Sequence, residues 1–280
     1  MADVRMATTL LLVRTKSAGG LEIFMVQRHR NSGFLPNAWV FPGGRVDPTD
    51  TIDGNPGVIG GDRVAERWTI PREQTIAHLV AGVRETFEEC GIWLGSRTPP
   101  PEDRVRLTSG QITIGDLLAS TGATMALDRL LPWSWWVTPV VEKRRYDTRF
   151  LLAVVDGEAI GSHDDHETVA SGWFDPAAIA AEATLGTFPL APPTWWTLRE
   201  LASYETIEAV SAASLERSDR PIQPILEFRS EGTLLLLPGH PEHPEPAIPG
   251  LPTHVVYEND RWVAQNASLS IPTLPGLPGS

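Results

Sequence analysis

The chain has a single cysteine, Cys90, among its 280 residues, so it cannot close an internal disulfide. The sequence therefore has no need of an oxidising compartment, and a reducing cytoplasm fits it. No apolar run approaches the roughly 20 residues that a helix needs to cross a bilayer. The N-terminal apolar stretch, residues 7–13, is cut off by Arg14 and lacks a secretory cleavage site. These absences predict a cytoplasmic protein with no membrane partner.

Basic side chains are also scarce. Lysine and arginine together number 23 against 35 aspartates and glutamates, which gives a formal net charge of −12. A surface that binds nucleic acid needs a basic face to replace the counterions of the phosphates, so we expect no nucleic-acid partner. The hydrophobic content of 41% over 280 residues is enough to bury a large core, as one domain or as a domain with an extension.

Apolar periodicity predicts strands that alternate with helices. The most helix-like stretch runs over residues 72–90, where apolar residues recur at offsets of three and four and Gly91 follows as a stop signal. Further helices are predicted over 176–184 and 193–215. Strands are predicted at 8–13, 21–28, 38–44, 135–141 and 148–155, with another inside 163–176. Because the first strands form hairpins, the pattern predicts the α/β class, with a mixed sheet flanked by helices.

Two segments depart from this alternation. Residues 45–71 are rich in Asp, Gly, Pro and Asn and show little periodicity, so they are predicted to form an irregular insertion. From Pro221 onward the chain has three short β runs, the last over 253–260, mixed with proline-rich stretches and a Pro/Gly tail. We therefore predict a main domain over 1–215 and a C-terminal extension over 216–280.

Three glutamates crowd the end of the predicted helix 72–90. In "RETFEECGI" the offsets of three and four place Glu85, Glu88 and Glu89 on one helical face, where like charges repel. A solvated acidic face is the simple interpretation of such a run. A bound divalent cation is the alternative, because it removes the repulsion and because carboxylate oxygens select hard ions such as Mg²⁺ or Mn²⁺.

The same nine residues resemble the second half of the Nudix box, which reads glycine, five residues, glutamate, seven residues, then R-E-U-x-E-E-x-G-U. The matching positions are Arg84, Glu85, Glu88, Glu89, Gly91 and Ile92. Counted back from Arg84, the first half falls on Ile70 and Ile76, which do not match. Gly44, at the end of "FPGG", is the better counterpart of the box glycine. It precedes Arg84 by 40 residues instead of 14, which predicts an insertion of 26 residues inside the box.

Further segments resemble, in the same order, a Nudix subfamily that includes the peroxisomal coenzyme A diphosphatases. They are "GFLPNAWVFPGGRVDPTD", "WWVTP", "RRYDTRFLLAVV" and "LAPPTWWTLREL". The resemblance implies a Nudix α/β/α sandwich and a Mg²⁺- or Mn²⁺-dependent pyrophosphohydrolase with a small nucleotide substrate. Coenzyme A or acyl-CoA is the first candidate, and its signature is recognisable at Arg28, Gly33 and "FPGG". NADH, ADP-ribose or another nucleotide conjugate is an alternative. A non-catalytic nucleotide-sensing module is a second alternative, against which the intact acidic cluster speaks.

The resemblance also implies roles for single residues. Glu88 and Glu89 are the leading metal ligands, and the Gly44 carbonyl is a further one. Glu85 is a ligand or the general base. Arg84 is expected to hold a second carboxylate in place and so to affect catalysis.

Three further predictions lie outside the box. In "HDDHE", residues 163–167, Glu167 is a candidate ligand or base, with a solvated acidic loop as the alternative. Arg28 and Arg149, near predicted strand ends, are candidate phosphate-binding residues because a guanidinium can bind phosphate bidentately. The tryptophans at 133, 135 and 136 are predicted to be core residues, with stacking on a base or ring of the substrate as the alternative. The sequence leaves open whether the chain forms a homodimer.

Overall fold

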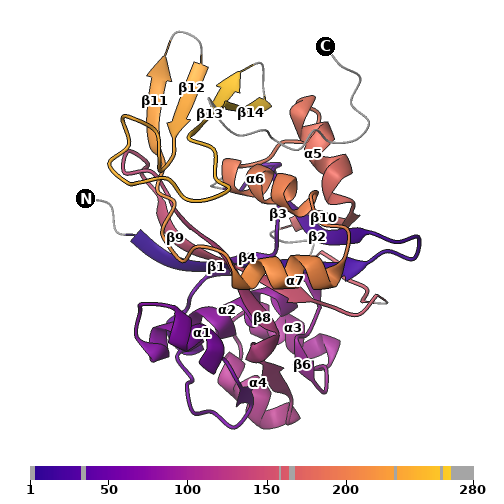
Figure 1. Ribbon diagram of the computed structural model, residues 1–280. Helices are drawn as coiled ribbons and strands as arrows, with labels where there is room; N and C mark the ends of the chain where they lie inside the picture. Colours follow the sequence, from indigo (N-terminus) through magenta and orange to yellow (C-terminus); the bar gives the residue numbers. More distant parts are fainter. Residues whose placement is uncertain are drawn as a thin grey trace.

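A mixed sheet forms the centre of the protein. The computed structural model describes residues 4–32, 36–157, 159–163, 168–229, 232–258 and 261–265. The strand order is β10-β2-β1-β9-β8, in which only the β1–β9 pair is parallel, while the short strands β3 and β4 pair with β2 and β1 (Figure 1). The strands are β1 Val4–Thr15, β2 Leu21–Arg28, β3 Trp39–Val40, β4 Gly43–Arg45, β8 Leu130–Val137, β9 Arg145–Val154 and β10 Thr168–Phe174.

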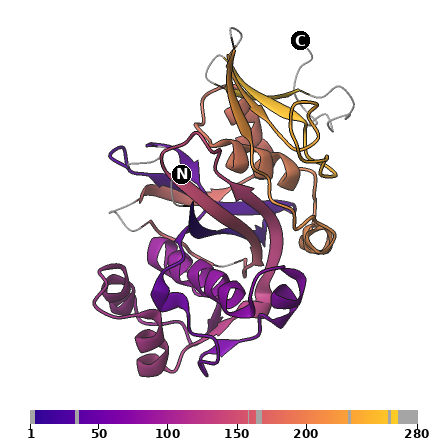
Figure 2. The ribbon, with the colours of Figure 1, turned by 90° about the vertical axis from the view of Figure 1, so that its left-hand side faces the viewer.

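Helices cover both faces of this sheet. On one face α2 packs with α1, α3 and α4, and its apolar side joins Leu10 and Leu12 of β1 in one core cluster. On the other face α5, α6 and α7 pack around Leu11 and Val13 in a second cluster (Figure 2). The predicted α/β/α sandwich with a mixed sheet is therefore confirmed. The helices are α1 Asp62–Arg67, α2 Arg72–Cys90, α3 Pro101–Thr108, α4 Ile114–Thr121, α5 Pro176–Thr184, α6 Pro192–Leu201 and α7 Ile207–Leu215.

The helix α2 has the bounds that the sequence predicts. Its apolar residues at 76, 79, 80, 83 and 87 are all buried, which follows from their helical spacing. Gly91 ends the helix in a left-handed conformation with φ of 71°. Gly82 lets the helix lie close to β1, because a methyl group there would come within 2.9 Å of the Leu10 side chain. This close contact fixes where the last turns of α2 carry their glutamates.

The segment 45–71 is more ordered than predicted. It contains the 3₁₀ helix η1 Pro48–Asp50, the strand β5 Val58–Ile59 and the helix α1. β5 joins β6 Gly95–Ser96 and β7 Thr124–Ala126 in a small second sheet, and η2 Leu127–Arg129 follows. These elements are too short to show periodicity, and tertiary contacts stabilise them instead.

Two other predicted elements are each divided. The helix predicted over 193–215 is two helices, α6 and α7, and Thr206 begins the second by accepting a hydrogen bond from the N–H of Ala209 (3.2 Å). The strand predicted over 38–44 is β3 and β4, which pair with different partners. Pro42 lies between them and cannot donate a ladder hydrogen bond, although its carbonyl accepts one from Leu10 (2.8 Å).

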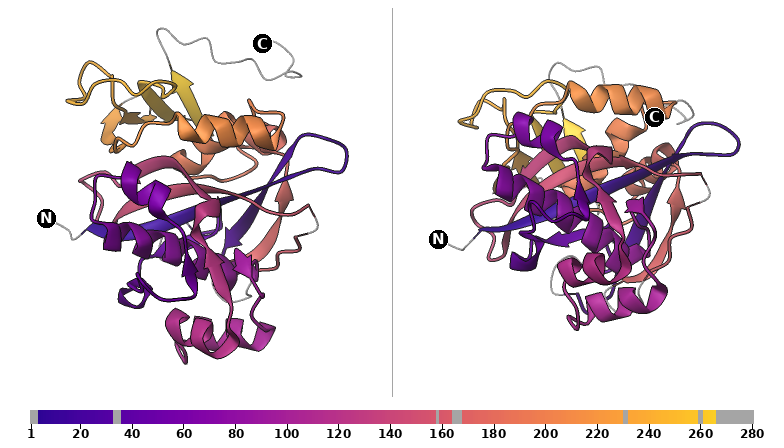
Figure 3. Two further views of the ribbon diagram at one scale, coloured as in Figure 1. Left: turned by 60° about the horizontal axis from the view of Figure 1, so that its bottom comes forward. Right: turned by 90° about the horizontal axis from the view of Figure 1, so that it is seen from below.

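The C-terminal part forms a separate antiparallel sheet of four strands. They are β11 Ile225–Arg229, β12 Gly232–Leu236, β13 His254–Glu258 and β14 Arg261–Gln265, of which the sequence predicted the first three. This sheet lies on the side of α5–α7, away from α1–α4 (Figure 3). Leu235, Leu237 and Val255 share a core cluster with Trp133 and Trp136. The domain boundary after residue 215 stays a prediction.

Among the residues that the structure describes, no helix has both the length and the apolar content needed to cross a membrane.

Candidate active site

The acidic end of α2 lies against the glycine strand β4. A methyl group on Gly44 would lie 2.4 Å from the carboxyl carbon of Glu85, so glycine leaves room for the Glu85 carboxylate in its present position. The N–H of Gly43 donates a hydrogen bond to Oε2 of Glu89 (3.0 Å). The two segments that resemble the halves of the Nudix box therefore meet in space. The role of the Gly44 carbonyl as a metal ligand stays a prediction.

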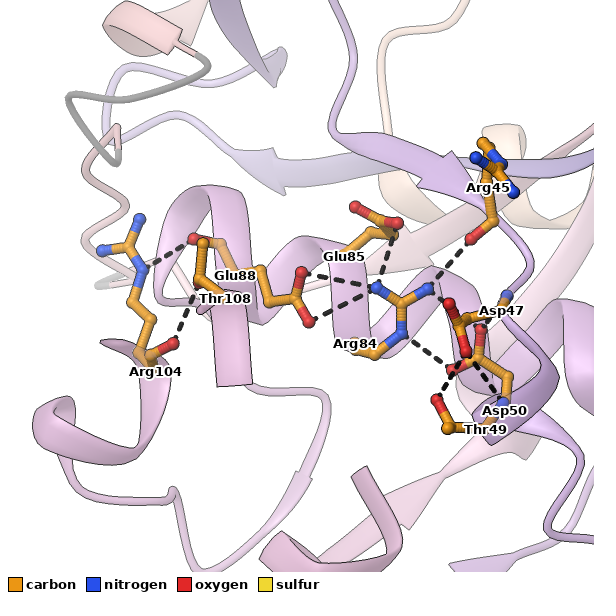
Figure 4. Close-up of polar contacts among 9 residues, drawn as sticks. All are labelled: Arg45, Asp47, Thr49, Asp50, Arg84, Glu85, Glu88, Arg104 and Thr108. Atoms are coloured by element: carbon orange, nitrogen blue, oxygen red, sulfur yellow. Dashed lines mark hydrogen bonds and ion pairs between the residues drawn. The ribbon is translucent and has the colours of Figure 1, made fainter. Parts of the chain in front are cut away.

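Arg84 lies at the centre of the carboxylates. Its Nε and Nη2 donate to the two oxygens of Asp50 (2.7 and 2.9 Å), and Nη2 also donates to the Arg45 carbonyl (2.9 Å) (Figure 4). Its Nη1 lies 3.0 Å from Glu85 and 3.3 Å from Glu88. The guanidinium therefore links the inserted segment to the acidic cluster, which we define as Glu85, Glu88 and Glu89.

Asp50 is the site residue that the sequence interpretation missed. It is fully buried, and the N–H of Asp47 also donates to it (2.7 Å) as part of the capping box of η1. The signal was in the sequence, because Asp50 follows Gly44 after five residues, the spacing of glycine and acid in the box. The interpretation instead considered Ile76, which is buried in the core. The geometry favours placing the extra residues after Asp50.

Burial and neighbouring charges shift the pKa values of Glu85 and Arg84. Burial raises the pKa of Glu85 to about 7, with the neighbouring Glu88 charge adding to the rise and the Arg84 charge opposing it. Burial alone would lower the pKa of Arg84. The hydrogen bond to Asp50 and the surrounding carboxylates outweigh that effect and raise the pKa of Arg84 above its ordinary value. Arg84 is therefore a permanent cation of the site.

The donor chemistry of the acidic cluster fits a hard divalent ion, because carboxylate oxygens are its preferred ligands. Within the described residues, however, no three acidic, histidine or cysteine side chains converge closely enough in this conformation to hold a metal. Arg84 contacts Glu85 and Glu88, and the Gly43 N–H contacts Glu89.

A cavity of about 730 Å³ opens beside the acidic cluster, within the size range typical of small-molecule sites. Gly43, Gly44 and the acidic cluster line it. Two cations, Arg28 and Arg45, also line it. The rest of the wall is largely apolar and includes side chains from the C-terminal sheet.

The two predicted phosphate-binding arginines lie in different places. Arg28 lines the cavity, and its guanidinium donates to Oγ of Ser32 (2.9 and 3.0 Å). Arg149 does not line it. Its neighbours Thr148 and Phe150 do, so strand alternation directs Arg149 to the other face of β9. The structure thus corrects the assignment of Arg149, and Arg45 is the second cavity cation.

Arg149 is instead enclosed by indole rings. Its guanidinium carbon lies 3.5 Å from the ring centre of Trp135 and 4.6 Å from that of Trp68. Burial lowers its pKa to about 10, although the charges of Asp147 and Asp219 oppose this. Trp133 and Trp136 are buried, which confirms that they are core residues, whereas Trp135 is half-buried against Arg149.

Two predicted residues, Gly33 and Glu167, lie outside the described residues, so their roles stay predictions.

The comparisons with known proteins agree with this site. A mixed sheet between helical layers, with an acidic helix end beside a glycine strand, defines the chain as a Nudix hydrolase. The solved structure of a NUDIX hydrolase from Alicyclobacillus acidocaldarius has a TM-score of 0.65 and 26% identity, and it covers 76% of this chain and 97% of its own. More particularly, the chain belongs to the NUDT19 Nudix domain family, whose model matches residues 55–201.

Curated relatives are similar over much of the chain. The acyl-coenzyme A diphosphatase NUDT19 of Homo sapiens is 26% identical over 276 residues, covering 81% of this chain and 73% of the human protein. That of Gallus gallus is 27% identical over 270 residues, covering 78% and 71%. A nudix hydrolase of Caenorhabditis elegans is 28% identical over 186 residues, which cover 64% of this chain. The match spans about half, 55%, of the nematode protein.

Proposed function

We propose that this Nudix hydrolase cleaves the diphosphate of coenzyme A or an acyl-CoA in a reaction that depends on a divalent metal ion, Mg²⁺ or Mn²⁺. The observation that carries the proposal is the convergence of the acidic cluster and the glycine strand β4 at the wall of a cavity of about 730 Å³. The relatives named as acyl-coenzyme A diphosphatases support this choice of substrate.

Different residues of the cavity would have different roles in hydrolysis. Nudix hydrolases generally use divalent metal ions, and such an ion activates water and neutralises charge on phosphoryl oxygens. Glu88 and Glu89 would hold it, together with the Gly44 carbonyl. Arg28 and Arg45 would bind the phosphates and position the anhydride.

Proton transfer falls to Glu85 in this proposal. Its pKa of about 7 is the property that a general base needs near neutral pH. Glu85 accepts a proton from water, the oxygen of water bonds to one phosphorus, and the bond from that phosphorus to the bridging oxygen breaks. Each product keeps one of the two phosphates of the former diphosphate. Arg84 contacts Glu85 and Glu88 and so holds them in position. Arg84 is a positioning residue because the carboxylates enclose its guanidinium.

The experiment is a hydrolysis assay with coenzyme A, octanoyl-CoA, NADH and ADP-ribose, each with Mg²⁺, with Mn²⁺ and with EDTA. We expect coenzyme A compounds to be cleaved fastest, only with metal, and Glu88→Gln to abolish most of the activity. Glu73→Gln is the matched control, because Glu73 lies on the first turn of the same helix and is exposed. Faster cleavage of NADH or ADP-ribose, or full activity in EDTA, would contradict the proposal.

The cytoplasmic location stays a prediction, and whether the chain forms a homodimer stays open.

A further inference from the structure

Part of the cavity wall is apolar, and the proposed chemistry does not use it. It is formed by Trp136 and Phe150 of the central sheet and by side chains of the C-terminal sheet. The latter come from three strands, with Leu226 on β11, Leu235 on β12 and Trp262 on β14. We call these five residues the apolar wall. A substrate that has its phosphates at the acidic cluster would extend its remaining part along this wall.

The start of α6 adds two proline rings to the cavity wall. Ala191, Pro192 and Pro193 line the cavity there. A helix N-terminus normally attracts an anion through its free N–H groups. Pro192 and Pro193 occupy the first two helical positions and have no N–H. The N–H of Trp195 is already bonded to the Ala191 carbonyl (2.9 Å). This helix start therefore presents two proline rings to the cavity, and Thr194 is its first residue with an N–H.

Trp262 is also fixed so that its ring is available to an apolar ligand. Its indole N–H donates to the Leu190 carbonyl (3.1 Å), just before α6. Its ring packs against Tyr257 with centroids 4.7 Å apart. The hydrogen bond joins β14 to the segment that leads into α6, so the C-terminal sheet is held against the cavity. Since the polar atom of Trp262 is already bonded, the indole contributes apolar surface to the wall.

We propose that the apolar wall is a subsite for the acyl chain of an acyl-CoA thioester, with Leu226 and Trp262 setting the chain length that fits. This subsite rests on the proposed function, since it places the phosphates of the same substrate at the acidic cluster. Each methylene of an acyl chain that leaves water favours binding. Acylated substrates therefore bind more tightly than free coenzyme A.

The test changes the size of one residue in two directions. Leu226 is half-buried, so Leu226→Trp narrows the subsite and Leu226→Ala widens it. For Leu226→Trp we expect the ratio of kcat/KM for octanoyl-CoA to that for free coenzyme A to fall about tenfold, the loss of one or two methylene contacts. For Leu226→Ala we expect the ratio for palmitoyl-CoA to octanoyl-CoA to rise. A shared folding defect cannot produce these opposite shifts.

The matched control is Phe228→Trp. Phe228 lies on the same strand, is 78% exposed and does not line the cavity. We expect this variant to keep the parental ratios. Equal kcat/KM values for free and acylated coenzyme A in the parent would overturn the subsite. Equal effects of Leu226→Trp and Phe228→Trp on the ratio of these values would overturn it as well.

A binding measurement separates the subsite from the proposed function. In EDTA, where no hydrolysis is expected, octanoyl-CoA should raise the melting temperature of the parent more than coenzyme A does, and Leu226→Trp should remove the difference. If this holds but no coenzyme A compound is hydrolysed with metal, the proposed function fails and the subsite stands. If octanoyl-CoA and coenzyme A give equal shifts, the subsite fails whatever the hydrolysis assay shows.

Discussion

Two arginines are buried on the α2 side of the central sheet, and their surroundings differ. Arg84 is 8% exposed and contacts three carboxylates, whereas Arg149 is 3% exposed and lies between two indole rings. The pKa of Arg84 is raised by its partners, while the pKa of Arg149 is lowered by burial. Burial alone therefore does not mark a functional arginine. The partners of the side chain distinguish the two residues. Arg84 is the centre of an ion-pair cluster beside the cavity, whereas Arg149 packs in the core.

The comparison predicts the largest stability effect at Asp50. Asp50→Ala should lower the free energy of unfolding by about 3–5 kcal/mol, because it removes the bidentate partner of a buried guanidinium. Urea unfolding measures this. The control is Asp62→Ala, since Asp62 pairs with the exposed Arg72 and should change the free energy of unfolding much less. Equal losses in the two variants would show that Arg84 does not depend on Asp50.

Glu88 tests whether the Arg84 region is catalytic as well as structural. Glu88→Gln should lower kcat by about 10²-fold or more, because it removes a carboxylate proposed to stabilise developing charge through a metal. Its melting temperature in EDTA should stay near that of the parent, since Arg84 keeps Asp50 and Glu85. The addition of Mg²⁺ should raise the parental melting temperature more than that of the variant. Near-parental turnover would remove Glu88 from the mechanism.

The Arg149 region should instead affect how the stability of the protein depends on pH. Burial, followed by the Arg149 charge, lowers the pKa of His78 from 6.5 to about 4, and Thr8 Oγ1 lies 2.9 Å from its Nδ1. Between these values the unfolded state binds more protons than the folded state. The stability from His78 is therefore complete above pH 6.5 and is lost as pH falls toward 4, by roughly 3 kcal/mol in total.

The measurement is the free energy of unfolding across this pH range for the parent and for His78→Gln. The difference between the two curves isolates the histidine from the carboxylates that titrate in the same window. We expect a shallower slope in the variant. Parallel curves would show that His78 is not responsible for the pH dependence.

Arg149 itself should give the smallest effect. Arg149→Leu loses its contacts with Trp68 and Trp135 but also removes a charge that is costly to bury, so stability should change by about 1 kcal/mol or less. Catalytic activity should stay within roughly twofold of the parent, because the side chain lies off the cavity. A large loss of activity with an unchanged melting temperature would return Arg149 to the substrate site.

Elements whose residue pattern is local can be predicted from the sequence alone. The spacing of apolar residues and glutamates in α2 follows from 3.6 residues per turn, so its bounds and the common face of the acidic cluster could be predicted. Most strands of the central sheet were likewise visible as apolar runs. The spacing of Gly44 and Asp50 is equally local, so Asp50 could also have been predicted as the acid of the box from the sequence.

The tertiary structure decided which distant segments meet. Asp50 and Arg84 are 34 positions apart, and the Trp262 hydrogen bond to Leu190 spans 72, so no periodicity links either pair. Whether Arg149 faces the cavity or the opposite core depended on the register of β9 against β1 and β8, because a shift of one residue exchanges the two faces. The C-terminal sheet became a cavity wall through apolar packing, which is non-directional and leaves no mark of its partner in the sequence.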